Sequence, residues 1–447
     1  MNINITRLIR SALPLSLLVL TACSGSGSTS SSASGPTYTL GGTISGLFPG
    51  DSVILKNNAA DALTVNANSA YNVNSTFTFA TAIASGVAYA VTAGTPTLNS
   101  ELCTVSNGTG TMGSAAISSV AVSCSGLETF AGDPLVPGTI NGTGTAARFN
   151  GPAGLATDSS GNIYVADYTN NAIRMITPAG VVSTVAGTPG AAVGNADSPT
   201  PSFNAPWGIT IDSATGNLYV SDYGSGHIRK ITSAGVVSTL TLTGATLLGP
   251  QGIVFSGGNL YVADTTGQAI KVIALSTGVV TTLAGTGTAG NNTDSTTGTL
   301  AVFHNPSGIT IDSAGNLYVA DTTNFAIRKI TPAGAVTTLA GTPSGSTPVG
   351  YQSANGACAS AGFYNPEGIT IDSSGNLYVA DNTNQTIRKI TLTPTCLVST
   401  VVGVAQTQGF VPGVLPGGLR TPIGVAISGT SLFITNMQGV ALITNKP

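Results

Sequence analysis

A repeated segment occupies most of the chain from residue 149 onward. Residues 303–341 show it most clearly, with the sequence FHNPSGITIDSAGNLYVADTTNFAIRKITPAGAVTTLAG. Each copy has a proline near its start, and these prolines are 44 to 60 residues apart: Pro152, Pro206, Pro250, Pro306, Pro366 and Pro422. A period of this length, with four short apolar runs separated by turn residues, is typical of the four-stranded blades of a β-propeller. The repeat therefore predicts an all-β fold.

Two runs within the repeat point to a family. GNLYVAD at residues 315–321 and 375–381, and IRKI at residues 327–330 and 387–390, resemble the signature of the NHL repeat. The resemblance implies an NHL-like propeller. Related six-bladed propellers include metal-dependent lyases that use several histidines, and lactonases that hold calcium with Glu, Asn and Asp.

The number of copies predicts six blades. Five copies are complete: 149–187, 203–240, 248–285, 303–341 and 363–403. A sixth begins at residue 420 and lacks its fourth strand, whereas LETFAG at residues 127–132 matches the fourth-strand type but precedes the first copy. We expect this strand to complete the last blade, because pairing would bury two sheet edges that are otherwise open to aggregation. The predicted propeller domain is 127–447.

The N-terminus reads as an export signal. Residues 1–22 combine Arg7 and Arg10 with a short apolar run, and LTAC resembles the bacterial lipobox, which implies cleavage before Cys23 and its acylation. The Ser- and Gly-rich residues 23–36 read as a flexible tether. We therefore expect a lipid-anchored protein of the bacterial cell envelope, in the outer membrane.

The balance of charge argues against nucleic acid as a partner. The chain has 14 basic and 17 acidic residues, and removal of the signal takes away two of the basic ones, which leaves a net charge of −5. A nucleic-acid-binding surface would instead need clustered Lys and Arg.

Residues 37–125 contain about seven strand-like runs and predict a small β-sandwich domain. Alternation through Val120, Val122 and Cys124 places this cysteine on the inward face. Cys103 lies in the preceding strand, so we expect a Cys103–Cys124 disulfide, which export makes chemically permissible. We interpret the segment as a spacer between membrane and propeller.

An acidic residue ends the second run of each complete copy, and a basic residue follows seven positions later. The pairs are Asp167 with Arg174, Asp222 with Arg229, Asp264 with Lys271, Asp321 with Arg328, and Asp381 with Arg388. Five equivalent pairs around a ring cannot all serve one active site. We expect the acid to cap the turn after its strand and the basic residue to offset its charge.

Few residues are suited to catalysis. The chain has two histidines, His227 and His304, and neither belongs to a cluster with metal-ligand spacing. We therefore predict no catalytic residues, no cofactor and no metal site. Oxygen ligands such as Asn150 and Glu367 leave a calcium site of the lactonase type open. A metal-assisted lactonase or lyase is thus the alternative to a binding protein, and an adhesive or architectural surface protein is a third reading.

Cys358 and Cys396 flank the fifth copy, and export favours their pairing. The first lies in the loop that enters the copy, and the second in the hairpin between its third and fourth strands. We expect these two places at opposite ends of a blade, which argues against a bridge. Both possibilities stay open from the sequence.

The candidate binding site is the channel mouth, where the first strand of each blade begins. Residues next to the repeated prolines differ from copy to copy, and a ring can hold one asymmetric ligand only where its copies differ. The candidate residues are Trp207, Gln251, His304, Tyr364, Glu367 and Arg420. We expect them to bind a protein or glycan partner, and the alternative is that they only fill the channel.

Overall fold

The computed structural model describes residues 35–48, 50–68, 74–97, 102–291, 293–341 and 353–445. The expected signal 1–22, the acylation site Cys23 and the tether up to residue 34 lie outside the described residues. Strands are the main regular secondary structure of the described chain, and its helices are single 3-10 turns of three residues. None of these helices is long and apolar enough to cross a membrane.

The first 90 or so described residues form two four-stranded sheets around one hydrophobic core. One sheet has the order β5 (Ser75–Thr78), β2 (Leu40–Ser45), β10 (Ile117–Ser125) and β8 (Leu102–Ser106). The other has the order β4 (Asp61–Asn66), β3 (Ser52–Asn57), β7 (Ala88–Ala93) and β9 (Thr109–Thr111), and β1 (Thr37–Tyr38) pairs with β6 (Ile83–Ala84). The expected inward alternation holds, since Val120, Val122 and Cys124 are buried. Cys124 stands opposite Cys103 in the ladder and forms the expected disulfide.

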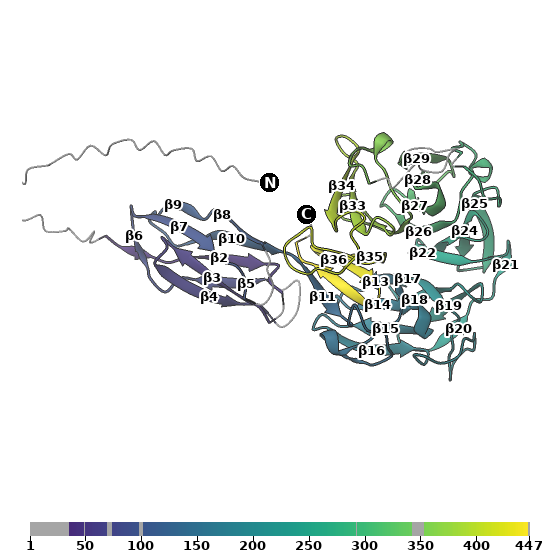
Figure 1. The fold of residues 1–447 in the computed structure, drawn as a ribbon, viewed down its shortest axis with the longest axis horizontal. Helices are drawn as coiled ribbons and strands as arrows, with labels where there is room; N and C mark the ends of the chain where they lie inside the picture. The colour runs from purple at the N-terminus through teal and green to yellow at the C-terminus, as the bar shows by residue number, and fades with distance from the viewer. Residues whose placement is uncertain are drawn as a thin grey trace, which may run out of the picture.

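The rest of the described chain forms a β-propeller, in which antiparallel sheets surround a common centre (Figure 1). The first two sheets are β13 (Pro152–Thr157), β14 (Ile163–Asp167), β15 (Ala172–Ile176), β16 (Val181–Ala186), and β17 (Pro206–Asp212), β18 (Asn217–Asp222), β19 (His227–Ile231), β20 (Val237–Thr239). The third and fourth are β22 (Pro250–Ser256), β23 (Asn259–Asp264), β24 (Ala269–Ala274), β25 (Val279–Ala284), and β26 (Pro306–Ile311), β27 (Leu317–Asp321), β28 (Ala326–Ile330), β29 (Val336–Ala340).

The last two sheets are β31 (Pro366–Ile371), β32 (Leu377–Asp381), β33 (Thr386–Thr391), β34 (Leu397–Val402), and β35 (Pro422–Ser428), β36 (Ser431–Asn436), β37 (Gly439–Ile443), β11 (Leu127–Ala131). Three sheets gain a short outer strand: β12 (Gly142–Thr143), β21 (Thr243–Gly244) and β30 (Gly356–Ala357). Each repeated proline begins the first strand of its sheet, which lies nearest the channel (Figure 1). The NLYVAD and IRKI runs form the second and third strands.

The early strand β11 completes the last sheet. It pairs antiparallel with β37, and Leu127 stands opposite Ile443. Leu127 is fully buried, and the Phe130 ring packs edge-on against Phe433 with 5.3 Å between ring centroids. The expected closure of the ring by residues 127–132 is therefore confirmed.

Six glycines bring the first strands close together. They follow the residue after each repeated proline: Gly154, Gly208, Gly252, Gly308, Gly368 and Gly424. A Cβ atom on any of them would overlap a backbone carbonyl of the next sheet, and at Gly424 the overlap would be with Ala153 of the first sheet. Glycine permits such close backbone contact because it has no side chain. The contacts run around the ring and return to its start.

Four sheets contain a fully buried ion pair at the end of the second strand. The pairs are Arg174–Asp167 (2.9 Å), Arg229–Asp222 (3.5 Å), Arg328–Asp321 (2.8 Å) and Arg388–Asp381 (3.0 Å). Each guanidinium also lies 5.0–5.1 Å from the centre of a phenylalanine ring: Phe149, Phe203, Phe303 and Phe363. The other carboxylate oxygen accepts the backbone N–H two residues before the repeated proline, as from His304 to Asp321 (2.8 Å). The expected pairing of charges is thus present, but the carboxylate fixes the loop that enters the sheet and does not cap the turn after its strand, since Asp167 and Asp321 make no side-chain capping bond to the 3-10 turns that follow them.

The third sheet departs from the expected pairing. The Lys271 ammonium group donates to Thr282 Oγ1 (2.8 Å), and no ion pair joins it to Asp264 among the described residues. Asp264 Oδ1 accepts the backbone N–H groups of Leu248 and Gly249. Lysine is a compact charge that lacks the planar fork of arginine, so it does not span the carboxylate and the loop together.

Cys358 and Cys396 form a disulfide with 5.4 Å between their Cα atoms. The geometric objection drawn from the sequence was wrong, because the entering loop runs along the outside of the sheet. There β30 pairs with β34, and the Cys358 N–H donates to the Cys396 carbonyl (3.1 Å). The loop therefore reaches the hairpin at the far end of the blade.

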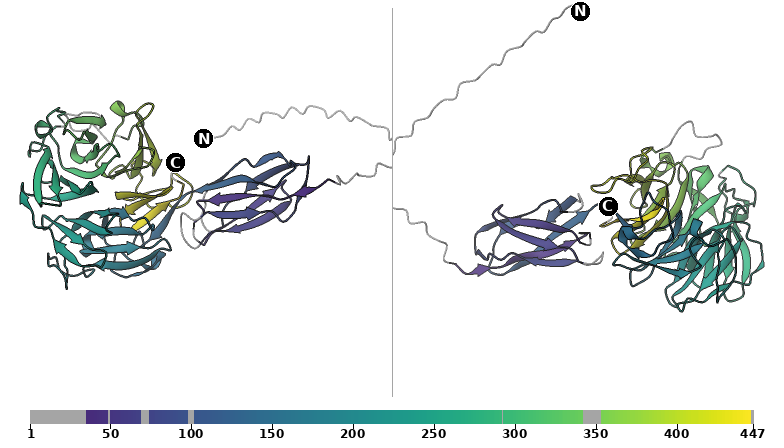
Figure 2. Two further views of the ribbon diagram at one scale, coloured as in Figure 1. Left: turned by 180° about the vertical axis from the view of Figure 1, so that it is seen from behind. Right: turned by 60° about the horizontal axis from the view of Figure 1, so that its bottom comes forward.

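The N-terminal sheets lie beside the last propeller sheet, as all three views show (Figures 1 and 2). Asn445 Nδ2 donates to the Cys124 carbonyl (2.9 Å), and Thr444 Oγ1 donates to the Gly46 carbonyl (2.7 Å). Phe48 is fully buried in a cluster with Phe130. These contacts join the two parts of the molecule through the C-terminal strand.

The buried ion pairs predict a difference between otherwise equivalent sheets. Replacing Arg328 by Met leaves Asp321 buried without its cation, so the free energy of unfolding should fall by about 3–5 kcal/mol. Lys271→Met is the matched control and removes one hydrogen bond, which should cost about 1 kcal/mol. Denaturant unfolding of both variants measures the difference. Equal losses would contradict a stabilising role for the pair.

Candidate functional site

The channel widens into a polar cavity at the end where the first strands begin. This mouth cavity has a volume of about 350 Å³. Its lining residues come from the second to the fifth sheet: Trp207, Tyr223, Gln251, Thr265, Thr266, Asn305, Ser307, Thr322, Thr323, Asn365 and Glu367. It is large enough for a small ligand, since ligand pockets commonly measure about 300–1,000 Å³.

Below the mouth the channel narrows and becomes apolar. A smaller cavity of about 70 Å³ is lined by the six glycines and by the apolar residue after each of them: Leu155, Ile209, Ile253, Ile309, Ile369 and Val425. These positions repeat around the ring, whereas the residues after the prolines do not. A polar or charged ligand would therefore be held at the mouth rather than in the neck.

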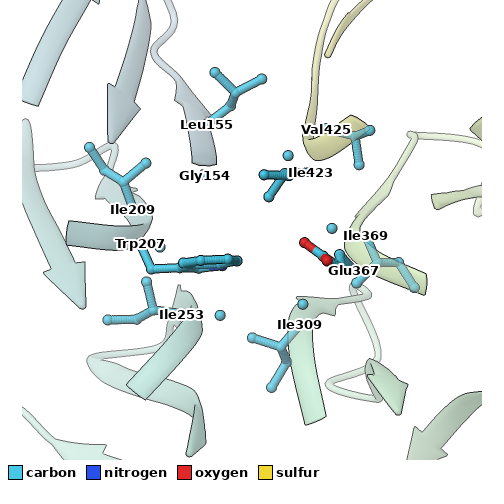
Figure 3. A pocket seen from close by; sticks show the side chains of 15 residues that line it. Gly154, Leu155, Trp207, Ile209, Ile253, Ile309, Glu367, Ile369, Ile423 and Val425 are labelled. Carbon is cyan, nitrogen blue, oxygen red and sulfur yellow. The ribbon is translucent and has the colours of Figure 1, made fainter. Parts of the chain in front are cut away.

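Trp207 and Glu367 point toward the same space from opposite sides of the channel (Figure 3). Trp207 comes from β17 and Glu367 from β31, and both residues border the mouth and the neck. Tyr168 holds the indole edge-on with 5.1 Å between centroids, and Tyr223 lies at 6.2 Å on a tilted plane. The ring is thus fixed by neighbouring aromatic residues.

The charge of the Glu367 carboxylate is poorly offset by hydrogen bonds. Its Oε2 atom is shielded from solvent and has no hydrogen-bond partner in the part of the chain that the structure describes. Burial raises the pKa of Glu367 from its ordinary value of 4.5 to about 7. Buried polar atoms are usually satisfied, so an unsatisfied one aimed into a cavity is a feature that a ligand can explain.

Other polar groups of the mouth bind one another or the backbone. Thr265 Oγ1 donates to the Pro306 carbonyl (2.6 Å), and Thr322 Oγ1 donates to the Pro366 carbonyl (2.7 Å). The Ser307 and Thr322 hydroxyls lie 2.6 Å apart. These bonds link each sheet to the next and keep the rim of the cavity in a fixed shape.

The structure brings together three of the six candidate binding residues. Trp207, Gln251 and Glu367 line the mouth cavity. His304, Tyr364 and Arg420 lie in the entering loops but do not line it; their backbone N–H groups donate to Asp321, Asp381 and Asn436. The residue after the proline faces the channel, whereas the residue two before it is fixed through its backbone.

Sequence reasoning missed the asparagines and threonines of the rim. Asn305 and Asn365 stand directly before the proline with φ values of 54° and 59°. Asparagine tolerates this left-handed conformation better than most residues, so Asn-Pro in the fourth and fifth copies was a usable signal. The rim threonines directly follow the aspartate that ends the second strand. The Thr-Thr pairs after Asp264 and Asp321 were therefore a second usable signal.

Among the described residues, no group of three or more His, Cys, Asp or Glu side chains is arranged to hold a metal ion. Asn150 and Glu367, the oxygen ligands considered from sequence, belong to the first and the fifth sheet, and Asn150 does not line the mouth cavity.

Four segments match the model of the NHL repeat: residues 149–174, 203–231, 303–330 and 363–390. They are the four copies with the buried Arg–Asp pair and its phenylalanine. The third copy has Leu247 and Lys271 instead, and the sixth has neither the phenylalanine nor the arginine. The chain thus carries NHL repeats, and its sheets form an NHL β-propeller, as expected.

Two curated proteins show related sequences. The chain is 29% identical over 276 residues to Protein SUPPRESSOR OF QUENCHING 1, chloroplastic, of Arabidopsis thaliana, which covers 55% of this chain and 25% of that protein. It is 27% identical over 303 residues to NHL repeat-containing protein 2 of Bos taurus, which covers 57% of this chain and 41% of that protein. The chain therefore spans less than half the length of these relatives.

Solved structures with low sequence identity share the fold. A protein of unknown function from Bacteroides thetaiotaomicron aligns with a TM-score of 0.57 and 17% identity over 88% of this chain and 90% of its own. An auxiliary nutrient binding protein from Bacteroides ovatus aligns with a TM-score of 0.56 and 13% identity over 92% of this chain and 98% of its own.

The raised pKa of Glu367 predicts a pH-dependent effect on stability. The folded protein holds this proton more tightly than the unfolded chain, so stability is lost as the pH rises from 4.5 through about 7. Glu367→Gln removes the titrating group, so the variant should not lose stability over this pH range. We expect its melting temperature to exceed that of the wild type at pH 8 and to equal it at pH 4. A lower melting temperature at pH 8 would show that the carboxylate stabilises the fold.

Proposed function

We propose that the protein is a lipid-anchored protein of the bacterial cell envelope whose six-bladed propeller binds a partner, a protein or a glycan, at the mouth of its channel. The observation that carries this proposal is the contrast between the two parts of the channel. The neck is lined mainly by residues that repeat in every sheet, with Trp207, Glu367 and Ile423 at its border, whereas the mouth is a hollow lined by residues that differ from sheet to sheet. Side chains that served only to fill the channel would leave little space there.

The fold relationship is consistent with a binding role. One protein with a TM-score above 0.5 is described as an auxiliary nutrient binding protein, and its alignment covers 92% of this chain. We infer that residues 37–125 form a sandwich that holds the propeller away from the membrane. Hydrogen bonds from Asn445 and Thr444 to this segment would make the spacer rigid.

The lipid anchor is tested by replacing Cys23. Cys23→Ser removes the proposed acylation site, so the protein should move from the membrane fraction to the soluble fraction. Acyl chains contribute about 0.8 kcal/mol per buried methylene, and more than one chain is needed for firm anchoring. Fractionation followed by immunoblotting measures the shift. Unchanged membrane association of the variant would contradict the proposal.

The binding site is tested at Trp207. Trp207→Ala should weaken capture of the partner by at least about tenfold, the effect of losing a central aromatic contact at about 1.4 kcal/mol or more. Binding of the soluble mature protein to glycan panels and to envelope extracts measures capture, and thermal unfolding measures the fold. His304→Ala, in a loop outside the cavity, is the control. Lower stability with unchanged capture would mean that Trp207 only fills the channel.

A further inference from the structure

The mouth cavity carries one charge and no countercharge. Glu367 is the only charged side chain among its lining residues, and the rest are Trp, Tyr, Gln, Asn, Ser and Thr. No ion pair to Glu367 occurs among the described residues, and its Oε2 atom has no hydrogen-bond partner there. A ligand that places a positive N–H or methylated nitrogen at this point would satisfy the carboxylate.

We propose that the channel mouth binds a small organic ammonium ion, held by the Glu367 carboxylate and in contact with the indole of Trp207. This inference rests on the proposed binding function and names the chemistry of its ligand. Cations are attracted to the face of an aromatic ring, most strongly to tryptophan, and more so where water is excluded. Trp207 lies across the channel from Glu367 and turns the rim of its indole toward the carboxylate, so a cation that contacts both lies beside this rim, against one face of the ring (Figure 3).

Neighbouring aromatic residues hold the Trp207 ring in place before a ligand binds. Tyr168 and Tyr223 pack against Trp207 at 5.1 and 6.2 Å between centroids and hold its plane. Tyr223 also lines the cavity and adds a second aromatic surface. A fixed ring loses little conformational entropy when a ligand arrives, which favours binding.

The charge and the donors of the site favour a monovalent organic cation over a metal ion. Calcium takes six to eight oxygen ligands, usually with several carboxylates. Here one carboxylate is present, and the Ser307 and Thr322 hydroxyls are already hydrogen-bonded to each other. The cavity volume of about 350 Å³ also suits an organic ion better than a bare metal ion.

Few other charged groups act on Glu367. Tyr223 is the other titratable residue of the cavity. His304 and Arg420 lie in loops of the neighbouring sheets and do not line it, and Asp381 is buried against Arg388. The pH dependence of ligand binding at the mouth should therefore reflect the protonation of Glu367 itself.

The experiment compares two molecules of the same shape. Choline and 3,3-dimethylbutan-1-ol differ in one atom, a charged nitrogen against a neutral carbon. Trp207 is the only tryptophan of the chain, so its fluorescence reports directly on the site. We expect choline to change this fluorescence at saturating concentration and the neutral alcohol to leave it unchanged. A second pair, glucosamine and glucose, shows whether an amino sugar is the better source of the ammonium group.

Two variants test whether choline binding depends on the Glu367 carboxylate. Glu367→Gln should weaken choline binding at least tenfold, whereas Asp133→Asn, which removes a surface carboxylate outside the channel, should leave it unchanged. Affinity of the wild type should fall about tenfold from pH 8 to pH 6, because a proton competes for a carboxylate with a pKa near 7. Glu367→Gln should lack this pH dependence. Thermal unfolding of both variants, with and without choline, confirms that each is folded.

Three outcomes would overturn the inference: equal binding of choline and its neutral analogue, no binding of any ammonium probe, or a response to Ca²⁺ alone that Glu367→Gln removes. None of them would remove the proposed binding function if partner capture still depends on Trp207. Loss of that dependence, with choline still bound through Glu367, would instead overturn the partner proposal and leave the ammonium site in place.

Discussion

The closed ring depends on close backbone contact at six glycines. Each glycine lies against the carbonyl of the residue after the proline in the next sheet, and any side chain would force the two sheets apart. The contact also sets the width of the channel. Because the glycine directly follows the variable residue, the same contact that closes the ring fixes the backbone of Trp207 and of Glu367. The repeated glycine that holds the ring together and the variable residue of the candidate site are thus adjacent positions of one strand.

Charged residues are few in this protein, and a regular set of them is buried. Only 7% of the residues are charged, and four arginines and four aspartates of that set form fully buried pairs that join the second strand of a sheet to its third. The pairs are hydrogen-bonded to backbone groups as well, which offsets the cost of burying them. The third sheet has Lys271 and Leu247 in place of arginine and phenylalanine, and Asp264 there accepts the backbone N–H groups of Leu248 and Gly249 without an arginine partner among the described residues.

The sequence was most informative where a physical requirement repeats. The spacing of Asp321 and Arg328 predicted a structural pair, and the misplaced strand at residues 127–132 predicted the closure of the ring, because an unpaired edge is costly. Features that depend on the path of a single loop were not predictable. Cys358 reaches Cys396 along the outside of its sheet, and only the structure shows that route. For the candidate site, variability next to proline indicated Trp207 and Glu367, which line the mouth cavity, but it did not distinguish side chains that face the channel from those, such as Arg420, whose backbone is fixed.

The pairing of β11 with β37 has a consequence for how the molecule is made. Leu127 and Ile443 are 316 positions apart, so the two strands of this contact are synthesised at nearly opposite ends of the propeller segment. Contacts of such long range form late, because the chain between them must be ordered first. Until residue 443 is available, β11 and the inner edge of the first sheet both lack their final neighbours. The last sheet therefore cannot be completed before its final strand is made: β11 has to wait for β37, and Thr444 and Asn445, which bond to the N-terminal sheets, come directly after that strand.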